Sequence, residues 1–185
     1  MHRLRVLALT LALPACGDAP ADRAARDAAP DSAREPAAQM DAAPPTSPDS
    51  LEVVFTRDEQ PLRLKRPVAD GEAGVEAALR ALLRGPTAEE RAAGATSWFS
   101  ATTIDALRSV SVDSAGLAVV DFADLRQLIP NAASSAGSAL LLHELNGTVF
   151  QFPDIAAVEY RIDGSCAAFW EWLQYDCQRV RRAGR

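Results

Sequence analysis

Hydrophobic and polar positions follow a helical period in one stretch of the chain and a strand period directly after it. From Ser138 onward apolar residues recur at helical spacing, which predicts a helix. Its apolar positions are Leu141, Leu142, Leu145 and Val149. A turn is expected at Phe152–Asp154, and alternation over Val158–Ile162 predicts a strand that ends at Asp163–Gly164. We expect this helix–turn–strand unit to form the centre of the fold.

The segments before this unit also show strand and helix patterns. Two β-rich runs, Leu51–Thr56 and Leu62–Val68, flank a polar stretch, so we expect a hairpin. Apolar residues then fall at i, i+3, i+4, i+7 and i+8, which predicts an amphipathic helix over Val75–Arg84. Gly85–Pro86 ends that helix. A short polar helix is expected over Thr87–Ala93.

Two more strands are expected before the central helix. They cover Ile104–Val112 and Leu117–Phe122, with a turn at Asp113–Gly116. A short helix over Asp124–Leu128 and a loop of small residues over Pro130–Ser138 follow. The lengths of the expected strands and helices suit one ordinary domain.

Trp98 and Phe99 are large apolar residues in a stretch rich in serine and threonine. They could be exposed and bind a ligand, or they could pack beneath a loop. We favour packing.

The N-terminal segment has the layout of a secretory signal. Arg3 and Arg5 are basic, and the apolar run Val6–Leu13 is shorter than the ~20 residues that span a bilayer. A small residue, Ala15, precedes Cys16. This layout predicts export.

The ending Leu13–Cys16 resembles the lipobox of bacterial lipoproteins, in which the cysteine is lipidated and the signal is cut before it. The resemblance implies a signal peptide over residues 1–15 and lipidation of Cys16. Two or more acyl chains anchor a protein firmly, whereas one does so only marginally. Pro14 departs from the usual residue at its place. The alternative is an ordinary signal with an incidental cysteine.

Residues 16–50 are rich in alanine, proline and aspartate after the cysteine and contain no aromatic residue. They cannot bury enough apolar surface to offset the entropy of ordering. We therefore expect a disordered tether with a root-mean-square span of roughly 30–35 Å. It would hold the folded part away from a membrane.

Five segments of the remaining chain follow one another in a specific order. They are Ala77–Pro86, Val110–Asp113, Ala118–Phe122, Leu145–Pro153 and Val158–Gly164. In this order they resemble the GerMN domain, a family named from sporulation and spore-germination proteins and found in envelope lipoproteins. The resemblance covers residues 51–164. It implies an α+β fold, a compact single domain with helices packed on a mainly antiparallel sheet, similar to ring-building modules. It also implies a binding or assembly role without catalytic residues.

The C-terminal extension, residues 165–185, combines two cysteines with crowded aromatic residues. Cys166 and Cys177 are eleven positions apart, and a disulfide between them suits an exported protein. Such a closed loop could add up to ~3 kcal/mol of stability. Metal binding is the alternative, but two cysteines without a neighbouring histidine make a poor zinc site.

The aromatic residues of the extension have two interpretations. They could cap an open edge of the core, which we favour. Alternatively, Trp170, Trp172 and Tyr175 could form a recognition patch for peptidoglycan sugars or a protein partner, because tryptophan and tyrosine are common interface anchors.

Charge and motifs narrow the function further. A net charge of −6 argues against nucleic-acid binding, and the arginines at 179, 181, 182 and 185 are interpreted as a solvated tail. No HExxH, GxSxG, Walker or Rossmann pattern occurs.

His143 is the one histidine beyond the signal, and we expect it on a helix face or boundary. Asp113, Asp121 and Asp163 lie at turns or strand ends, where aspartate is ordinary.

The sequence thus predicts a lipid-anchored, non-catalytic binding or assembly module on the extracytoplasmic face of the cell membrane or outer membrane. Its expected partners are envelope proteins, with peptidoglycan as a further candidate, and no cofactor or metal is expected. The alternative is a cell-wall-active enzyme or an accessory peptidoglycan-binding domain. An accessible cleft rich in carboxylates or centred on histidine would favour the enzyme, and an exposed sheet edge or aromatic patch would favour the binding module.

Overall fold

A computed structural model of the chain describes residues 50–67 and 74–184. The expected signal peptide, the lipidation residue Cys16 and the expected tether before Ser50 lie outside the described residues. In the part of the chain that is described, no helix is long and apolar enough to cross a membrane.

The first two strands form the expected hairpin. Strand β1 (Ser50–Arg57) pairs antiparallel with β2 (Gln60–Pro67) from Ser50 opposite Pro67 to Arg57 opposite Gln60. Asp58 and Glu59 make a two-residue turn with positive φ angles of 50° and 62°, as a tight hairpin requires. β1 is largely buried, whereas β2 exposes every second side chain.

A second sheet contains four strands in the order β3-β4-β5-β6. Their bounds are Leu107–Val112, Leu117–Phe122, Ala157–Ile162 and Val180–Arg181. Among the strand pairings of the described residues, only β4 with β5 is parallel. A parallel pair needs a long crossover connection, and the central helix lies in this one.

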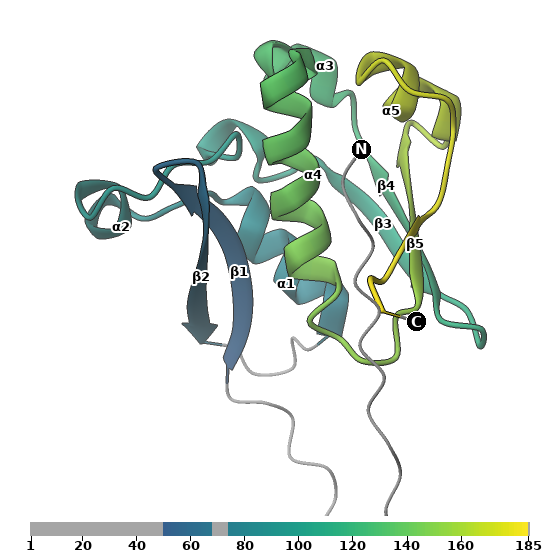
Figure 1. Cartoon of the computed structure of the whole chain (residues 1–185), viewed down its shortest axis with the longest axis horizontal. Coiled ribbons are helices and arrows are strands. Elements are labelled where there is room, and N and C mark those ends of the chain that lie inside the picture. The colour runs from purple at the N-terminus through teal and green to yellow at the C-terminus, as the bar shows by residue number, and fades with distance from the viewer. Residues whose placement is uncertain (1–49, 68–73, 185) are drawn as a thin grey trace, which may run out of the picture. The chain divides into compact units, whose positions relative to one another are not determined.

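Five α-helices and two 3₁₀ turns accompany the sheets in the described residues. The helices are α1 (Gly74–Leu83), α2 (Ala88–Ala92), α3 (Leu125–Leu128), α4 (Ser135–Val149) and α5 (Cys166–Trp172). The 3₁₀ turns are Ala101–Thr103 and Pro130–Ala133. Helix α4 stands between the hairpin and the four-stranded sheet, while α5 packs against that sheet's β5 (Figure 1). The expected α+β fold with helices on a mainly antiparallel sheet is confirmed.

Two predicted boundaries are wrong. Strand β3 begins at Leu107 instead of Ile104, because Ile104 follows a 3₁₀ turn with helical backbone angles. The expected loop over Pro130–Ser138 is a 3₁₀ turn followed by the first turn of α4. The Ser134 hydroxyl caps this helix by accepting the Gly137 N–H at 3.1 Å.

Helix α4 is bonded directly to β1. The Thr148 hydroxyl accepts the Val54 N–H at 3.0 Å, and the Gln151 amide both accepts from and donates to the backbone of Glu52. A Cβ atom at Gly147 would lie only 2.9 Å from the Val54 side chain. A glycine at this position therefore allows the close approach of helix and strand.

Candidate functional site

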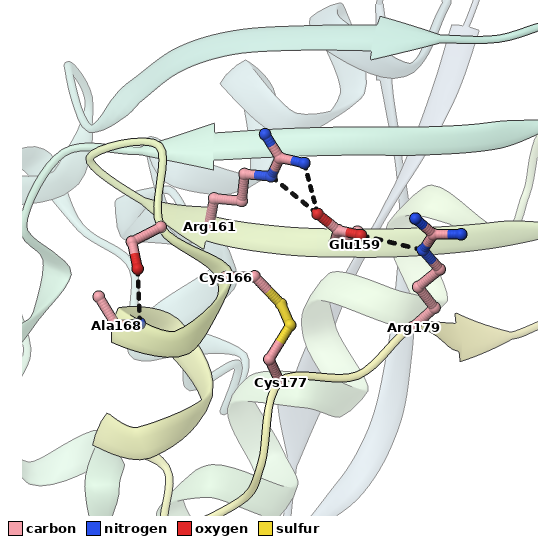
Figure 2. Close-up of a disulfide and its surroundings, with 7 residues drawn as sticks. Glu159, Arg161, Cys166, Ala168, Cys177 and Arg179 are labelled. Carbon is pink, nitrogen blue, oxygen red and sulfur yellow. Dashed lines mark hydrogen bonds and ion pairs between the residues drawn. A yellow bond between two sulfur atoms is a disulfide. The ribbon is translucent and has the colours of Figure 1, made fainter.

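The C-terminal extension folds as a cap, residues 165–184, on the four-stranded sheet. Ser165 caps α5 by accepting the Ala168 N–H at 3.1 Å. Figure 2 shows a disulfide that joins Cys166, at the start of α5, to Cys177 in the segment before β6, and their Cα atoms are 5.5 Å apart. The bond ties the helix to the strand that pairs with β5.

The aromatic residues of the cap divide between core and surface. Phe169 and Trp170 are buried at 0% and 1% exposure, and the Phe169 ring lies 5.2 Å from that of Tyr160 in β5. Trp172 is half-buried, and Tyr175 is 50% exposed. Trp170 therefore belongs to the core, and the expected patch of three exposed rings is reduced to Trp172 and Tyr175. One side of α5 must face the sheet, which removes Trp170 from the surface.

A buried glutamate connects the cap with the sheet. Glu159 of β5 is 7% exposed and binds the guanidinium groups of Arg179 at 2.9 Å and Arg161 at 2.5–2.8 Å (Figure 2). The hydrogen bond from Arg179 and then that from Arg161 hold the pKa of Glu159 below its usual value, against the effect of burial.

The interpretation of the terminal arginines as a solvated tail is wrong for two of them. Arg179 binds Glu159, and Arg182 donates to the carbonyl oxygens of Phe150 at 2.5 Å and Ile155 at 2.8–2.9 Å. The Arg182 guanidinium also lies 5.2 Å from the Phe150 ring centre. A cation at the end of α4 suits the carbonyl groups that a helix leaves unpaired there.

The aspartates singled out in the sequence have structural roles. Asp113 accepts the backbone N–H groups of Ala115 and Leu117, and Asp121 accepts that of Gly164, each at 2.8–2.9 Å. Asp163 forms an ion pair with Arg108. No group of three metal-ligating side chains is assembled anywhere in the described ranges.

His143 is exposed on α4. The burial of the next residue, Glu144, was not predicted from the sequence. Glu144 has 0% exposure and points to the loop between α2 and the 3₁₀ turn at Ala101–Thr103. The Ser97 hydroxyl of that loop donates to Glu144 Oε2 at 2.7 Å. Glu144 Oε1 is buried and has no hydrogen-bond partner among the described residues.

Glu144 lines a pocket of about 190 Å³, which we call the Glu144 pocket. Its lining residues are Thr56, Thr96, Ser97, Trp98, Leu140 and Glu144. Burial raises the pKa of Glu144 to about 8, although the Ser97 hydroxyl and the Trp98 backbone favour the ionised form. The carboxyl group is therefore mainly protonated at neutral pH, and it contributes no negative charge to the pocket.

Neighbouring contacts hold the walls of the pocket in place. Thr56 and Thr96 exchange backbone hydrogen bonds at 2.7 Å and 3.0 Å, which pins the loop to the end of β1. The Trp98 indole N–H donates to the Gly137 carbonyl of α4 at 3.1 Å, and Phe99 is 1% exposed beneath the loop. Phe99 packs as expected, whereas Trp98 is half-buried and also forms a wall of the pocket.

Helical spacing contained a signal for Glu144. The buried positions of α4 include Leu141, Glu144, Leu145 and Thr148, which share one face at i, i+3, i+4 and i+7. A glutamate on the apolar face of a helix predicts a buried or functional carboxyl group, because glutamate is rarely buried without a partner.

The described fold is a compact α+β domain in which helices cover a mainly antiparallel sheet. The family model for sporulation and spore germination proteins, Germane, matches residues 46–166. The chain therefore belongs to this family, and the GerMN resemblance is confirmed. No curated protein is significantly similar to the chain.

Solved structures of low sequence identity are also similar. The first GerMN domain of the sporulation protein GerM from Bacillus subtilis is 19% identical, with a TM-score of 0.47 and coverage of 62% of this chain and 83% of that one. The tandem GerMN domains of the same protein are 14% identical, with a TM-score of 0.49 and coverage of 72% and 45%. A candidate lipoprotein from Clostridium perfringens is 19% identical, with a TM-score of 0.41 and coverage of 72% and 85%.

Proposed function

We propose that this protein is a lipid-anchored, non-catalytic module that binds or assembles other components of the bacterial cell envelope. The family match over residues 46–166 carries the proposal, because it covers the hairpin, strands β3, β4 and β5 of the second sheet and the central helix. The lipobox-like Leu13–Cys16 supports anchoring through Cys16 on the extracytoplasmic face. The disulfide between Cys166 and Cys177 suits the oxidising surroundings of an exported domain.

The geometry of the Glu144 pocket supports a binding role over hydrolysis. Glu144 is the only titratable side chain among the described residues that line it. Glycoside hydrolysis typically uses two carboxyl groups about 5–10 Å apart, one on each side of the scissile bond. A lone protonated acid can donate a hydrogen bond, but it supplies neither the nucleophile nor the base of that reaction.

The anchor is tested first by metabolic labelling with palmitate. The label should enter the wild-type protein and be lost in Cys16→Ala. Equal labelling of both proteins, or of neither, would contradict lipidation at Cys16.

The assembly role is tested by crosslinking in intact cells. Lys65 is the only lysine of the chain and is exposed on β2, whereas Tyr175 is exposed on the cap. A photo-reactive amino acid placed separately at each position reports which face meets a partner, and Cys16→Ala provides the untethered control. We expect a defined set of envelope proteins at one position, with capture lost in the control. Capture of nothing at either position would count against assembly.

A further inference from the structure

The Glu144 pocket contains one polar group that the described residues do not satisfy. Leaving a buried polar atom without a partner costs roughly 1–3 kcal/mol. A volume of about 190 Å³ far exceeds the roughly 10–15 Å³ that one water molecule needs. The exposed Thr96 belongs to the lining, so the pocket is open at the surface.

The hydrogen bonds around Glu144 determine what its free oxygen can offer. The Ser97 hydroxyl oxygen accepts the Phe99 N–H at 3.0 Å, which leaves its own proton for Glu144 Oε2. When Oε2 accepts from Ser97, a protonated Glu144 carries its proton on Oε1. The pocket therefore presents an O–H donor beside the hydroxyl groups of Thr56 and Thr96.

The remaining walls favour a neutral ligand with an apolar part. No cationic side chain lines the pocket in the described part of the chain, so an anion would lose its hydration without an opposing charge. The Trp98 indole is held by Gly137, and with Leu140 it provides a rigid apolar surface. An occupant should combine a carbonyl oxygen with a small apolar group.

We propose that the Glu144 pocket binds a neutral secondary amide that carries a small apolar substituent, such as an acetamido group. The carbonyl oxygen accepts the Glu144 O–H, the methyl group packs against Trp98 and Leu140, and the amide N–H donates to a threonine hydroxyl. The amide chemistry follows from the pocket alone. The source of such an amide rests on the proposed function: in the cell envelope it would come from N-acetylated amino sugars or from peptide.

Fluorine NMR of the full chain labelled with 5-fluorotryptophan tests this inference. The chain has three tryptophans, of which only Trp98 lines the pocket, so Trp170 and Trp172 are internal controls. Trp98→Phe assigns the reporting signal. We expect N-acetylglucosamine to shift the Trp98 signal saturably at millimolar concentration, while glucose and the cationic glucosamine leave it unchanged. N-acetylalanine methylamide distinguishes a peptide source from a sugar source.

A matched pair of variants separates pocket binding from other effects. Leu140→Trp fills the pocket from a half-buried position, and Ala139→Trp adds the same side chain at the exposed neighbouring position. We expect the apparent Kd to rise about tenfold or more in Leu140→Trp, a loss of at least about 1.4 kcal/mol, and to stay unchanged in Ala139→Trp. Saturable shifts with either amide support the inference. Equal shifts with glucose, stronger binding of glucosamine, or no shift with either amide would overturn it, whatever the outcome of the crosslinking and labelling experiments.

Discussion

The two buried carboxyl groups of the described residues have opposite surroundings. Glu159, between the sheet and the C-terminal cap, is held by two arginines that lower its pKa. Glu144, between α4 and the loop that contains Ser97, has the Ser97 hydroxyl as its side-chain partner and no ion pair among the described residues, and burial raises its pKa to about 8 against the effect of Ser97 and the Trp98 backbone.

This difference shows two ways of burying an acid. Near the cap, opposite charges keep Glu159 ionised and bind the chain end to β5, so the acid contributes to stability. In the Glu144 pocket the acid avoids the cost of a buried charge by holding its proton, and one of its oxygens still lacks a partner. Each region keeps one buried polar atom without a partner among the described residues, Trp170 Nε1 in the cap and Glu144 Oε1 in the pocket. Only Glu144 is an acid that lines a pocket, and a buried acid with a raised pKa in a pocket is typical of a binding site.

The largest expected effect on stability comes from a substitution in the core of the cap. Phe169→Ala removes a fully buried ring that contacts Tyr160 and Phe122, so the free energy of unfolding should fall by about 3–5 kcal/mol. Tyr175→Ala, at an exposed position of the same cap, is the control and should cost less than about 1 kcal/mol. Urea unfolding followed by circular dichroism measures both. Equal small losses would show that the cap is not part of the core.

The next effect concerns pH and Glu144. The unfolded chain releases this proton near the ordinary pKa of 4.5, whereas the folded chain holds it up to about pH 8. The free energy of unfolding should therefore decrease as the pH rises between these values, by on the order of a few kcal/mol. Glu144→Gln keeps the shape without the charge, and it should unfold at higher urea than wild type at pH 8.

Ala139→Gln, at an exposed position of the same helix, is the control for Glu144→Gln and should retain the wild-type pH profile, because it removes no titratable group. An unchanged pH dependence in Glu144→Gln would mean that Glu144 is ionised in the folded protein, which would remove the acid donor from the pocket.

Reduction of the disulfide should have a smaller effect on the cap. Cys166 and Cys177 close a short loop, so Cys177→Ala should lower the free energy of unfolding by up to ~3 kcal/mol under oxidising conditions. Thermal unfolding with and without reductant measures the loss. The wild-type melting temperature should drop in reductant, while that of Cys177→Ala should not move. If the wild-type melting temperature were the same with and without reductant, the disulfide would not contribute to the stability of the cap.

Glu159→Gln should have the smallest effect. Arg179 is 60% exposed at its side chain, so solvent screens the pair, and the expected loss at pH 7 is about 1 kcal/mol. Because the folded-state pKa is lowered, this contribution is present above the ordinary value of 4.5 and is lost as the pH falls through the folded pKa. The sign of this pH effect is opposite to that of Glu144. A stability difference between wild type and Glu159→Gln that shrinks toward zero as the pH falls below 4.5 would support the contrast, and a difference that persists at low pH would contradict it.

The sequence predicts elements well where one face of an element is apolar. The bounds of β4 agree with the predicted Leu117–Phe122, and α1 agrees within a residue at each end, because regular spacing marks both. The start of α4 was missed because Ser135–Ser138 has no large apolar residue. In this segment the small residues Gly137 and Ser138 are buried, and a pattern of large hydrophobic residues does not reveal such packing positions.

The site was harder to predict than the fold. The pairing of Cys166 with Cys177 was suggested by their spacing of eleven residues and by the expected export, but the division of the aromatic residues depends on how α5 turns toward the sheet. The Glu144 pocket brings together Thr56, Ser97 and Glu144, which are far apart in the chain. In the sequence this site is signalled by the position of Glu144 on an apolar helix face and by Trp98 in its serine- and threonine-rich stretch.

The hydrogen bonds between α4 and β1 have a consequence for synthesis of the chain. They join residues 94 and 99 positions apart, so the ribosome completes the hairpin long before its covering helix exists. Until Thr148 and Gln151 have been made, the backbone of β1 lacks these partners and Val54 lacks its contact with Gly147. For about half of its translation the nascent chain therefore displays an apolar strand without the helix α4 that covers it, and incompletely covered strands invite aggregation.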